Sequence, residues 1–394
     1  MSVSRRIKLF FTIIILLGLT VFYPFVVYTS NPFVSELRTL WISTAMETMT
    51  HQWLATAFFP ADMVSEVVGA RQALFESQKD IQSIWGQDGQ TATDKVDTNL
   101  SPEDQFYALF EEIDRASCEA FFAENPRYIE DGYDKINMDW CEKGEDTGIV
   151  TKQGDKVVAI NTEKSLMIVR LEREGLLGTE YNGYLAVVKD PSRVELGLCR
   201  GMGKREGQRI ADLADYNEAI LGINASGFID NGEVAEGGTP YGYVKHDGEL
   251  IQGAFGHGYK IIGFDDQHRF LIGDTTTAEQ MIDAVEFGPA LIVNGQKIEE
   301  LGSVESLQPR TAIGQTEDLT VLMLVINGRG QGSSMGCRGV DLRDILWDYG
   351  AVQACNLDGG SSSVMYYQGR VISSPTTSTN NPEGRRLPNA FIVK

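Results

Sequence analysis

Six polar segments rich in glycine follow apolar runs in the C-terminal part of the chain. Glycine at the end of a strand lets a ligand approach the backbone closely and lets amide N–H groups converge on one point, which suits an anion such as phosphate. We therefore expect the functional site in these loops. They are INASGF (223–228), EGGTPYG (236–242), FGPALIVNG (287–295), PRTAIG (309–314), INGRGQGSS (326–334) and NLDGGSSSVM (356–365).

The side chains of these loops supply the groups that recognition of a sugar phosphate needs. Arg310 offers a bidentate cation for phosphate or carboxylate, and Asp358 or Glu236 offers a carboxylate. Each has a structural alternative, because Gly-Gly pairs often form turns, Asp before Gly often caps its own loop, and Arg before Thr can tie two strands together. The presence of six such loops in one region favours the functional interpretation over these structural alternatives. Donors to sugar hydroxyls are Asn224, Ser361 and Ser362.

Other familiar chemistries lack their motifs in this sequence. There is no P-loop and no strand-linked G-x-G-x-x-G, since GRGQGSSMG (328–336) has the wrong glycine spacing. The nucleophile elbow G-x-S-x-G is also missing. The four histidines show no metal-ligand spacing, so a two-metal hydrolase is disfavoured. An oxygen-ligand Ca²⁺ among the Asp and Asn loops is compatible with the sequence, but no ligand pattern requires it.

Three of the segments, PRTAIGQTED, NLDGGSSSVM and the closing RRLPNAFIV, resemble the phosphodiester glycosidase domain family. The resemblance covers roughly residues 155–394 and keeps the motifs in order. It implies hydrolysis of a sugar-1-phosphodiester to a free sugar and a phosphomonoester. The N-terminal part resembles bacterial, membrane-tethered members described as exopolysaccharide-related.

The resemblance also implies site residues. Asp358, Glu236 and Arg310 correspond to catalytic positions. As a mechanistic hypothesis, we assign Arg310 and the Gly359 and Gly360 amides to the phosphate and the two carboxylates to the sugar, one as base or nucleophile and the other orienting. This sequence has Ser361 where the family usually has a third glycine. The added hydroxymethyl group can change which sugar the loop accepts, so the identity of the sugar is the property most affected by this difference. The substrate-binding positions are Asn224, Ser226, Gly227, Gly359, Gly360, Ser361, Ser362, Asn327 and Arg329.

Two functional interpretations remain open at this point. The first is a hydrolase acting on sugar-1-phosphodiesters of cell-envelope or exopolysaccharide glycans, including polymers that resemble teichoic acid. The second is a non-catalytic polysaccharide-binding module that uses the same loops. A hydrolase loses turnover when its carboxylates are removed, whereas a binding module tolerates their loss.

Composition narrows the range of partners. The chain has 394 residues, with 34 Lys and Arg against 55 Asp and Glu, for a net charge of −21. Such a charge repels nucleic acid, whose binding depends on clustered cations. The length is sufficient for two or three domains. Of the acidic excess, about half falls in residues 94–146, which we interpret as a solvated face.

The N-terminal sequence predicts a membrane anchor. No charged residue occurs from Leu9 to Ser35, and this length can cross a bilayer as a helix. A cleaved signal peptide is disfavoured because the first alanine is Ala45. Since Arg5, Arg6 and Lys8 precede the span, we expect a cytoplasmic N-terminus, one crossing through residues 9–29, and an extracellular C-terminal part.

In the middle of the chain, segments with the apolar spacing of a helix alternate with a polar segment. Apolar residues recur at helical spacing in residues 36–76, and among them Trp41 and Trp53 are expected to pack against the rest of the protein. A helix on a membrane surface usually carries a face rich in Lys and Arg, which this one lacks. Residues 77–104 read as a linker, and helical spacing resumes over residues 105–125.

From about residue 155 onward, short β-like runs separated by turn residues predict a sheet-rich domain. Helices are predicted over 207–222 and 341–350, and the capping-box spacing places another start at Thr276 or Thr277. The strands and helices do not alternate regularly, so we predict an α+β fold with a mixed sheet. The predicted organisation is an anchor (1–35), a mostly helical acidic region (36–154) and a catalytic domain (155–394).

The five cysteines contain no C-x-x-C pair, which disfavours a zinc site. Cys118 and Cys141 could form a disulfide outside the cell, whereas free buried thiols are the simpler interpretation. The sequence leaves this choice open.

Overall fold

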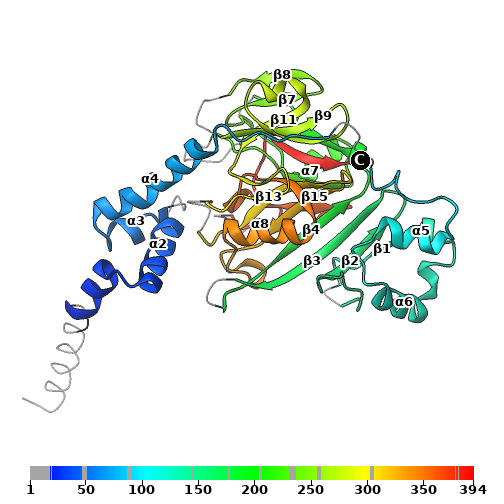
Figure 1. Ribbon diagram of the computed structural model, residues 1–394, viewed down its shortest axis with the longest axis horizontal. Helices are drawn as coiled ribbons and strands as arrows, with labels where there is room; N and C mark the ends of the chain where they lie inside the picture. The colour runs from blue at the N-terminus through cyan, green and yellow to red at the C-terminus, as the bar shows by residue number, and fades with distance from the viewer. Residues whose placement is uncertain are drawn as a thin grey trace, which may run out of the picture. The chain divides into compact units, whose positions relative to one another are not determined.

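The computed structural model describes residues 18, 20–46, 51–86, 91–143, 146–175, 178–203, 206–229, 237–254, 259–301, 306–377, 379 and 381–394 (Figure 1). The chain divides into two compact units, Met1–Ala73 and Leu74–Lys394. Each unit is described by itself. The second unit begins well before the domain boundary at residue 155 that the sequence predicts.

The first unit is helical. Residues 20–28 form a helix, followed by α2 (Pro32–Met46), α3 (Trp53–Thr56) and α4 (Ala61–Gln78), which continues into the second unit. A small core of Ile42, Ala45, Ala55 and Val64 holds these helices together.

Residues 1–17 and 19 lie outside the described residues, and among them are 9–17 and 19, about half of the span predicted over 9–29. Within the described part of the chain, no helix combines the length and the apolar character needed to cross a membrane.

The prediction that the two tryptophans of this unit pack against the protein is wrong. Trp41 and Trp53 are both exposed, although Leu54 and Met46 of the same helical pattern pack on the core. The helical period identifies an apolar face, but it does not specify which medium covers that face. In this unit, several helical turns carry large aromatic side chains that the described residues of the unit leave exposed.

The described residues of the second unit form three β-sheets. The largest has nine strands in the order β1-β2-β3-β4-β15-β14-β16-β12-β13. These strands are β1 (Asn137–Asp139), β2 (Lys156–Asn161), β3 (Leu166–Glu174), β4 (Glu180–Val188), β12 (Ala290–Val293), β13 (Gln296–Lys297), β14 (Arg310–Thr316), β15 (Val321–Ile326) and β16 (Ala351–Asn356).

Two five-stranded sheets accompany it, with the orders β10-β9-β11-β7-β8 and β18-β17-β6-β19-β5. The first contains β7 (Val244–His246), β8 (Glu249–Gln252), β9 (Lys260–Asp265), β10 (Phe270–Gly273) and β11 (Met281–Phe287). The second contains β5 (Val194–Leu198), β6 (Leu221–Asn224), β17 (Met365–Tyr367), β18 (Arg370–Val371) and β19 (Asn389–Val393).

The α+β prediction is confirmed, but the prediction of a mixed sheet is wrong for the described strands. Neighbouring strands pair antiparallel in all three sheets. Short connections such as those joining β3 to β4 and β14 to β15 return the chain beside itself, and such hairpins give antiparallel pairs. Helix α8 (Gly339–Asp348) connects β15 to β16, yet β14 lies between those two strands.

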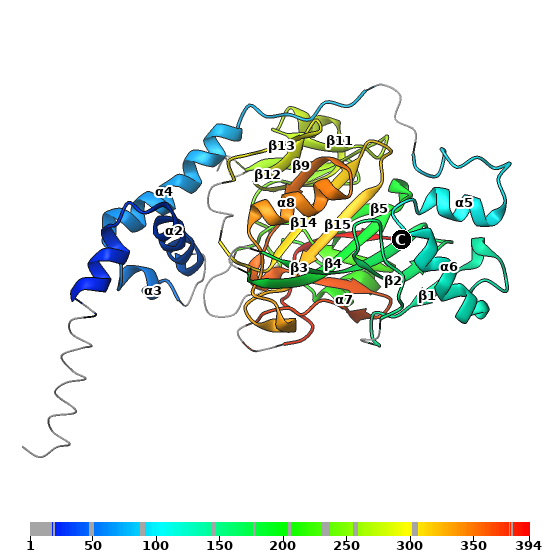
Figure 2. The same cartoon turned by 60° about the horizontal axis from the view of Figure 1, so that its bottom comes forward.

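The large sheet is buried on both faces, because alternate residues of each strand enter different cores. In β15, Leu322 and Leu324 join one cluster, whereas Val321 and Met323 join the other. The first cluster includes residues of α5 (Pro102–Leu109), α6 (Arg115–Glu124) and α8, and the second includes residues of both smaller sheets. Helix α8 packs on β12, β14 and β16 of the large sheet, and Figure 2 shows it lying over these strands.

The helices partly match their predictions. The predicted helix over 105–125 is broken into α5 and α6, because Asp114 caps α6 by accepting from the Ser117 N–H. The predicted helices near 207–222 and 341–350 are α7 (Ile210–Tyr216) and α8. The capping box at Thr276 is wrong: only a short 3₁₀ turn, Thr277–Gln280, follows, and the Thr276 side chain makes no cap. Other 3₁₀ turns are Pro126–Tyr128, Tyr133–Lys135, Pro191–Arg193, Gln331–Ser333 and Gly360–Ser362.

Part of the predicted linker is fixed to the sheets. The Ser83 N–H donates to the Ile272 carbonyl at 2.8 Å, and the Trp85 indole N–H donates to the Phe270 carbonyl at 2.9 Å. Buried Lys260 donates to the carbonyls of Lys79 and Ile81. The stretch 78–86 is therefore held against the sheets of the second unit, of which it is part.

The cysteines are free thiols. Cys118 is fully buried and Cys141 partly buried, and neither forms a disulfide in this structure. Burial raises the pKa of the Cys118 thiol to about 12, which keeps it protonated and unreactive at neutral pH.

Candidate active site

Most of the predicted site residues gather at one edge of the large sheet, because the strands that carry them are antiparallel neighbours. Arg310 at the start of β14 pairs with Ile326 at the end of β15. Two residues on, Ala312 pairs with Asn356 at the end of β16. The loops that contain Asn327 and Asp358 therefore leave the sheet beside the start of β14.

Asn224, at the end of β6, ties three of these segments together. Its Oδ1 accepts from the Thr311 hydroxyl at 2.8 Å and from the Val364 N–H at 3.1 Å. Its Nδ2 donates to the carbonyl of Asp358 at 2.5 Å. Because Asn224 is completely buried and its amide bonds within the protein, the geometry favours a positioning role. Direct contact with the substrate stays a prediction.

Asp358 has the most perturbed carboxyl group of the predicted site. Burial raises its pKa from 3.8 to about 6. The hydroxyl of Ser362, the positive charge of Arg385 and the N–H of Gly359 oppose this rise by stabilising the carboxylate. A carboxyl group with this pKa is partly protonated near neutral pH, so it can accept or donate a proton there.

Arg310 is buried and bonded within the protein. Its Nη2 donates to both the carbonyl and the hydroxyl of Ser306 at 2.8 Å, and its Nε lies 3.5 Å from the Cys337 carbonyl. These contacts tie the segment that precedes β14 to the segment that precedes α8. They favour a positioning role for Arg310, and its predicted role on the phosphate stays untested.

Arg329 occupies the more open position. Its Nη1 donates to the Ser361 hydroxyl at 3.0 Å, and its Nε and Nη2 donate to the Gln308 Oε1 at 2.9 and 2.7 Å. Gly360 passes close beneath it with a φ of +61°, and a Cβ there would lie 3.2 Å from Nη2. The Gly-Gly-Ser segment thus lets the guanidinium approach the backbone of this loop.

The loop amides that were expected to bind phosphate already have acceptors. The Gly360 N–H donates to the Pro309 carbonyl at 2.8 Å. The Gly359 N–H stabilises the ionised Asp358 carboxyl group and so opposes the rise in its pKa that burial causes. The geometry therefore does not support a phosphate cradle built from these two amides.

The other predicted substrate-binding residues lie at the same edge. Asn327 is buried, donates to the Asn182 Oδ1 at 2.8 Å and accepts from the Ser374 N–H at 2.6 Å. Ser226 is buried and donates through both its N–H and its hydroxyl to the Asn389 Oδ1 at 2.9 Å. At Gly227, a Cβ would lie 3.2 Å from the Phe287 ring, so only glycine fits comfortably.

Glu236 lies outside the described residues. The adjoining Gly237 is described, and its backbone lies against that of Arg386, where a Cβ would come within 2.0 Å of the carbonyl oxygen.

Sequence reasoning missed Arg385, whose guanidinium lies 4.5 Å from the centre of the Phe228 ring and whose charge acts on Asp358. The available signal was the RRLPNAFIV segment, which leads into β19.

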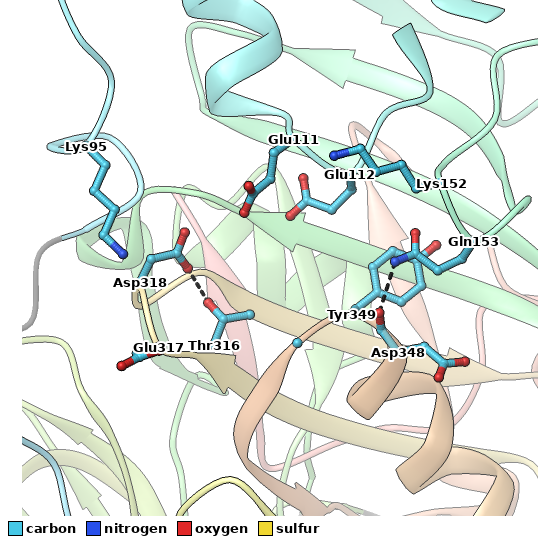
Figure 3. A pocket seen from close by; sticks show the side chains of 11 residues that line it. Lys95, Glu111, Glu112, Lys152, Gln153, Thr316, Glu317, Asp318, Asp348 and Tyr349 are labelled. Carbon is cyan, nitrogen blue, oxygen red and sulfur yellow. Dashed lines mark hydrogen bonds between the residues drawn. The ribbon is translucent and has the colours of Figure 1, made fainter.

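A separate pocket of about 390 Å³ lies at the opposite end of β14. It is lined by Thr316 to Asp318, by the end of α8 and by Glu111 and Glu112. Figure 3 shows these side chains around the opening. Because β14 runs from Arg310 to Thr316, this pocket is not part of the candidate active site.

Among the described residues, no group of three or more His, Cys, Asp or Glu side chains is placed to hold a metal ion. The Ca²⁺ that the sequence allows is therefore given no ligand set here.

Comparisons with known proteins bear on this edge of the sheet. Residues 217–394 match the family model of the phosphodiester glycosidases. A relative from Bacillus subtilis (strain 168), described as the SPbeta prophage-derived uncharacterized protein YomE, is 26% identical over 186 residues. The match covers 44% of this chain and 28% of the relative, so this chain spans little more than a quarter of that protein's length.

Two solved structures are similar to parts of the chain. The catalytic domain of zebrafish N-acetylglucosamine-1-phosphodiester alpha-N-acetylglucosaminidase, auto-inhibited by its pro-peptide, is 19% identical with a TM-score of 0.49, over 58% of this chain and 82% of that one. A hypothetical protein from Synechocystis is 15% identical with a TM-score of 0.48, over 62% and 65% of the two chains.

The family match begins at residue 217, so β6 and all the candidate site residues lie inside it, whereas β1 to β5 precede it. The resemblance seen in the sequence motifs is confirmed for this segment. Residues 217–394 are thus similar to the phosphodiester glycosidase domain that this family model describes.

Proposed function

We propose that the protein hydrolyses sugar-1-phosphodiester bonds in cell-envelope or exopolysaccharide glycans. The observation that carries the proposal is Asp358, whose carboxyl group has a pKa of about 6 at the sheet edge where the family's motifs converge. A carboxyl group partly buried at an energetic cost, inside a segment similar to a glycosidase domain, is a candidate for proton transfer.

The reaction exchanges one bond for another. The bond between the anomeric carbon and the phosphate oxygen breaks, water supplies a hydroxyl to the sugar, and its proton goes to the departing phosphomonoester or to solvent. Because a phosphate ester is a weakly basic leaving group, little general-acid assistance is needed. Asp358 then acts on the sugar side, either as a base toward water or as a nucleophile at the anomeric carbon.

The phosphate needs cations and hydroxyl donors. Arg310 is buried and already donates to Ser306, so we propose other residues for phosphate binding. Arg329 and Ser361 are bonded to each other and partly accessible, and Arg385 lies near enough to influence Asp358. We assign Arg329, Ser361 and Arg385 to the phosphate, with Arg310 and Asn224 holding the loops in place. Glu236 stays the proposed second carboxylate.

The test uses the full-length protein and a GlcNAc-1-phosphodiester of a short alcohol. Proton and phosphorus NMR follow the free sugar and the phosphomonoester together. We expect equal amounts of both products, loss of turnover in Asp358→Asn and unchanged turnover in Asp266→Asn, which alters an exposed turn carboxylate. Binding of purified envelope polymer without release of sugar would favour the non-catalytic module instead.

Membrane anchoring is the second part of the proposal. The uncharged stretch Leu9–Ser35 and the preceding cations support a single crossing with the catalytic domain outside. Extraction of membranes with alkaline carbonate tests it, because a spanning protein stays in the pellet. Release into the supernatant would contradict anchoring and leave the hydrolase assignment intact.

A further inference from the structure

The helical unit exposes large apolar side chains along its described length. In the helix over 20–28, Phe22 is 66% exposed and Tyr28 is 70% exposed. Phe33 and Trp41, eight residues apart on one face of α2, are 55% and 53% exposed, and Trp53 of α3 is 55% exposed. Water is a poor solvent for so many rings in so short a segment.

The polar atoms of Trp41 and of Tyr23, a further exposed ring of the helix over 20–28, bond within the unit. The Trp41 indole N–H donates to the carbonyl of Leu54 at 3.1 Å. The Tyr23 hydroxyl donates to the carbonyl of Phe58 at 2.8 Å. What these side chains present outward is therefore mainly apolar ring surface.

The break between the first helix and α2 is also satisfied internally. The Nη1 of Arg38 donates to the carbonyls of Val26, Val27 and Thr29 at 3.0, 2.9 and 3.3 Å, and its Nη2 donates to the Ser35 hydroxyl at 3.0 Å. Carbonyls at the end of a helix need donors, and water ordinarily supplies them. With Arg38 as their donor, these carbonyls keep hydrogen bonds where lipid excludes water, so the break between the helices is compatible with a membrane environment.

Charge is almost absent around these rings. Between residues 18 and 61, the charged residues are Glu36, Arg38 and Glu47. One of them, Arg38, is partly buried against the helix end. Residues 18–61 thus carry no basic face for anionic headgroups, so apolar contact has to hold this stretch to a bilayer.

We propose that the helix over 20–28 is the end of the proposed span, and that α2 and α3, which follow it, lie within the lipid surface of the membrane with their exposed rings in the outer acyl region. A second copy of the chain is a weaker candidate for the occupant. Residues 20–25 and 28 are exposed on nearly every side of their helix, and a dimer interface covers one face, whereas lipid surrounds a helix. Tryptophan and tyrosine favour this depth of the bilayer.

This inference does not depend on hydrolysis, and it differs from the proposed span because it concerns where Trp41 and Trp53 lie. The experiment mixes the full-length protein with phosphatidylcholine vesicles whose acyl chains carry bromine, which quenches tryptophan emission at contact. The test variant is Trp41→Phe with Trp53→Phe. The matched control is Trp347→Phe, which removes a partly exposed ring of the second unit.

We expect the wild type and the Trp347→Phe protein to lose part of their emission in brominated vesicles. The double variant should lose that quenched component while its far-UV circular dichroism stays unchanged. Quenching should persist when salt rises from about 0.1 M to about 1 M, because apolar contact is not screened.

Equal quenching in the wild type and the double variant would overturn the inference, since other tryptophans would then account for it. Unquenched emission from a vesicle-bound protein that sediments as a dimer in detergent would assign the rings to a second copy instead. A protein that does not bind vesicles at all would contradict both this inference and the proposed span.

Discussion

The pKa of Asp358 predicts that removing its charge stabilises the folded protein. In Asp358→Asn the half-buried carboxyl becomes a neutral amide of similar shape. The native pKa of about 6 lies about 2 units above the value of 3.8 for a free carboxyl. Each unit corresponds to about 1.4 kcal/mol, so ionised Asp358 costs the native state about 3 kcal/mol at neutral pH.

The sign of the pH dependence follows from the direction of the shift. The folded state keeps the Asp358 proton up to about pH 6, whereas the unfolded chain releases it near pH 3.8. Below pH 3.8 both states are protonated and the cost vanishes. As the pH rises from about 4 to about 6, the wild type loses stability relative to the variant, and above that the difference is constant.

The assay is urea unfolding of both proteins at several pH values between 4 and 8. Other carboxyl groups titrate equally in the two proteins, so they cancel in the difference. We expect the variant to be about 3 kcal/mol more stable at pH 7.5, less the loss of any bond that the amide cannot make. A difference that stays constant across this range would refute the desolvation of Asp358, and Asp266→Asn should show no such trend.

Three further substitutions probe the architecture of the site and of the domain. Asn224→Ala removes three buried hydrogen bonds, so urea unfolding should show a loss of about 3 kcal/mol, and a loss under about 1 kcal/mol would mean that Asn224 does not join the loops. Gly360→Ala and Gly248→Ala both place a side chain at positive φ, but only Gly360 lies against Arg329. Turnover should therefore fall about tenfold in Gly360→Ala alone, and equal effects would refute the role of that contact. Lys189→Met leaves Glu112, bonded at 2.5 Å in the native protein, buried without its partner, so the free energy of unfolding should drop by about 3 to 5 kcal/mol, and an unchanged value would contradict this pairing.

The strands were predictable because a strand buried on both faces appears in the sequence as a continuous run of apolar residues. The segment LTVLMLVI gives β15, whose six residues are all buried, and KVVAI gives most of β2. What could not be predicted is which strands pair. Pairing depends on contacts far apart in the sequence, so the antiparallel order β4-β15-β14-β16 is not visible in any one segment.

The site was predictable as a set of loops, and less so as a set of roles. The motifs placed Asp358, Asn224 and Arg310 together, but their order along the chain does not show which polar atoms already have partners. Arg310 finds acceptors at Ser306 and Cys337, and Asn224 uses both ends of its amide. Only the folded structure separates residues that hold the loops from residues that remain accessible to a ligand.

The measurement that tests the central claim most directly is hydrolysis of a GlcNAc-1-phosphodiester in water enriched in ¹⁸O. Phosphorus NMR distinguishes phosphate that carries the heavy isotope. If the enzyme breaks the bond between the anomeric carbon and oxygen, the label enters the sugar, and the released phosphomonoester shows no isotope shift. A shifted phosphorus signal would mean attack at phosphorus, and the protein would then be a phosphodiesterase rather than a glycosidase.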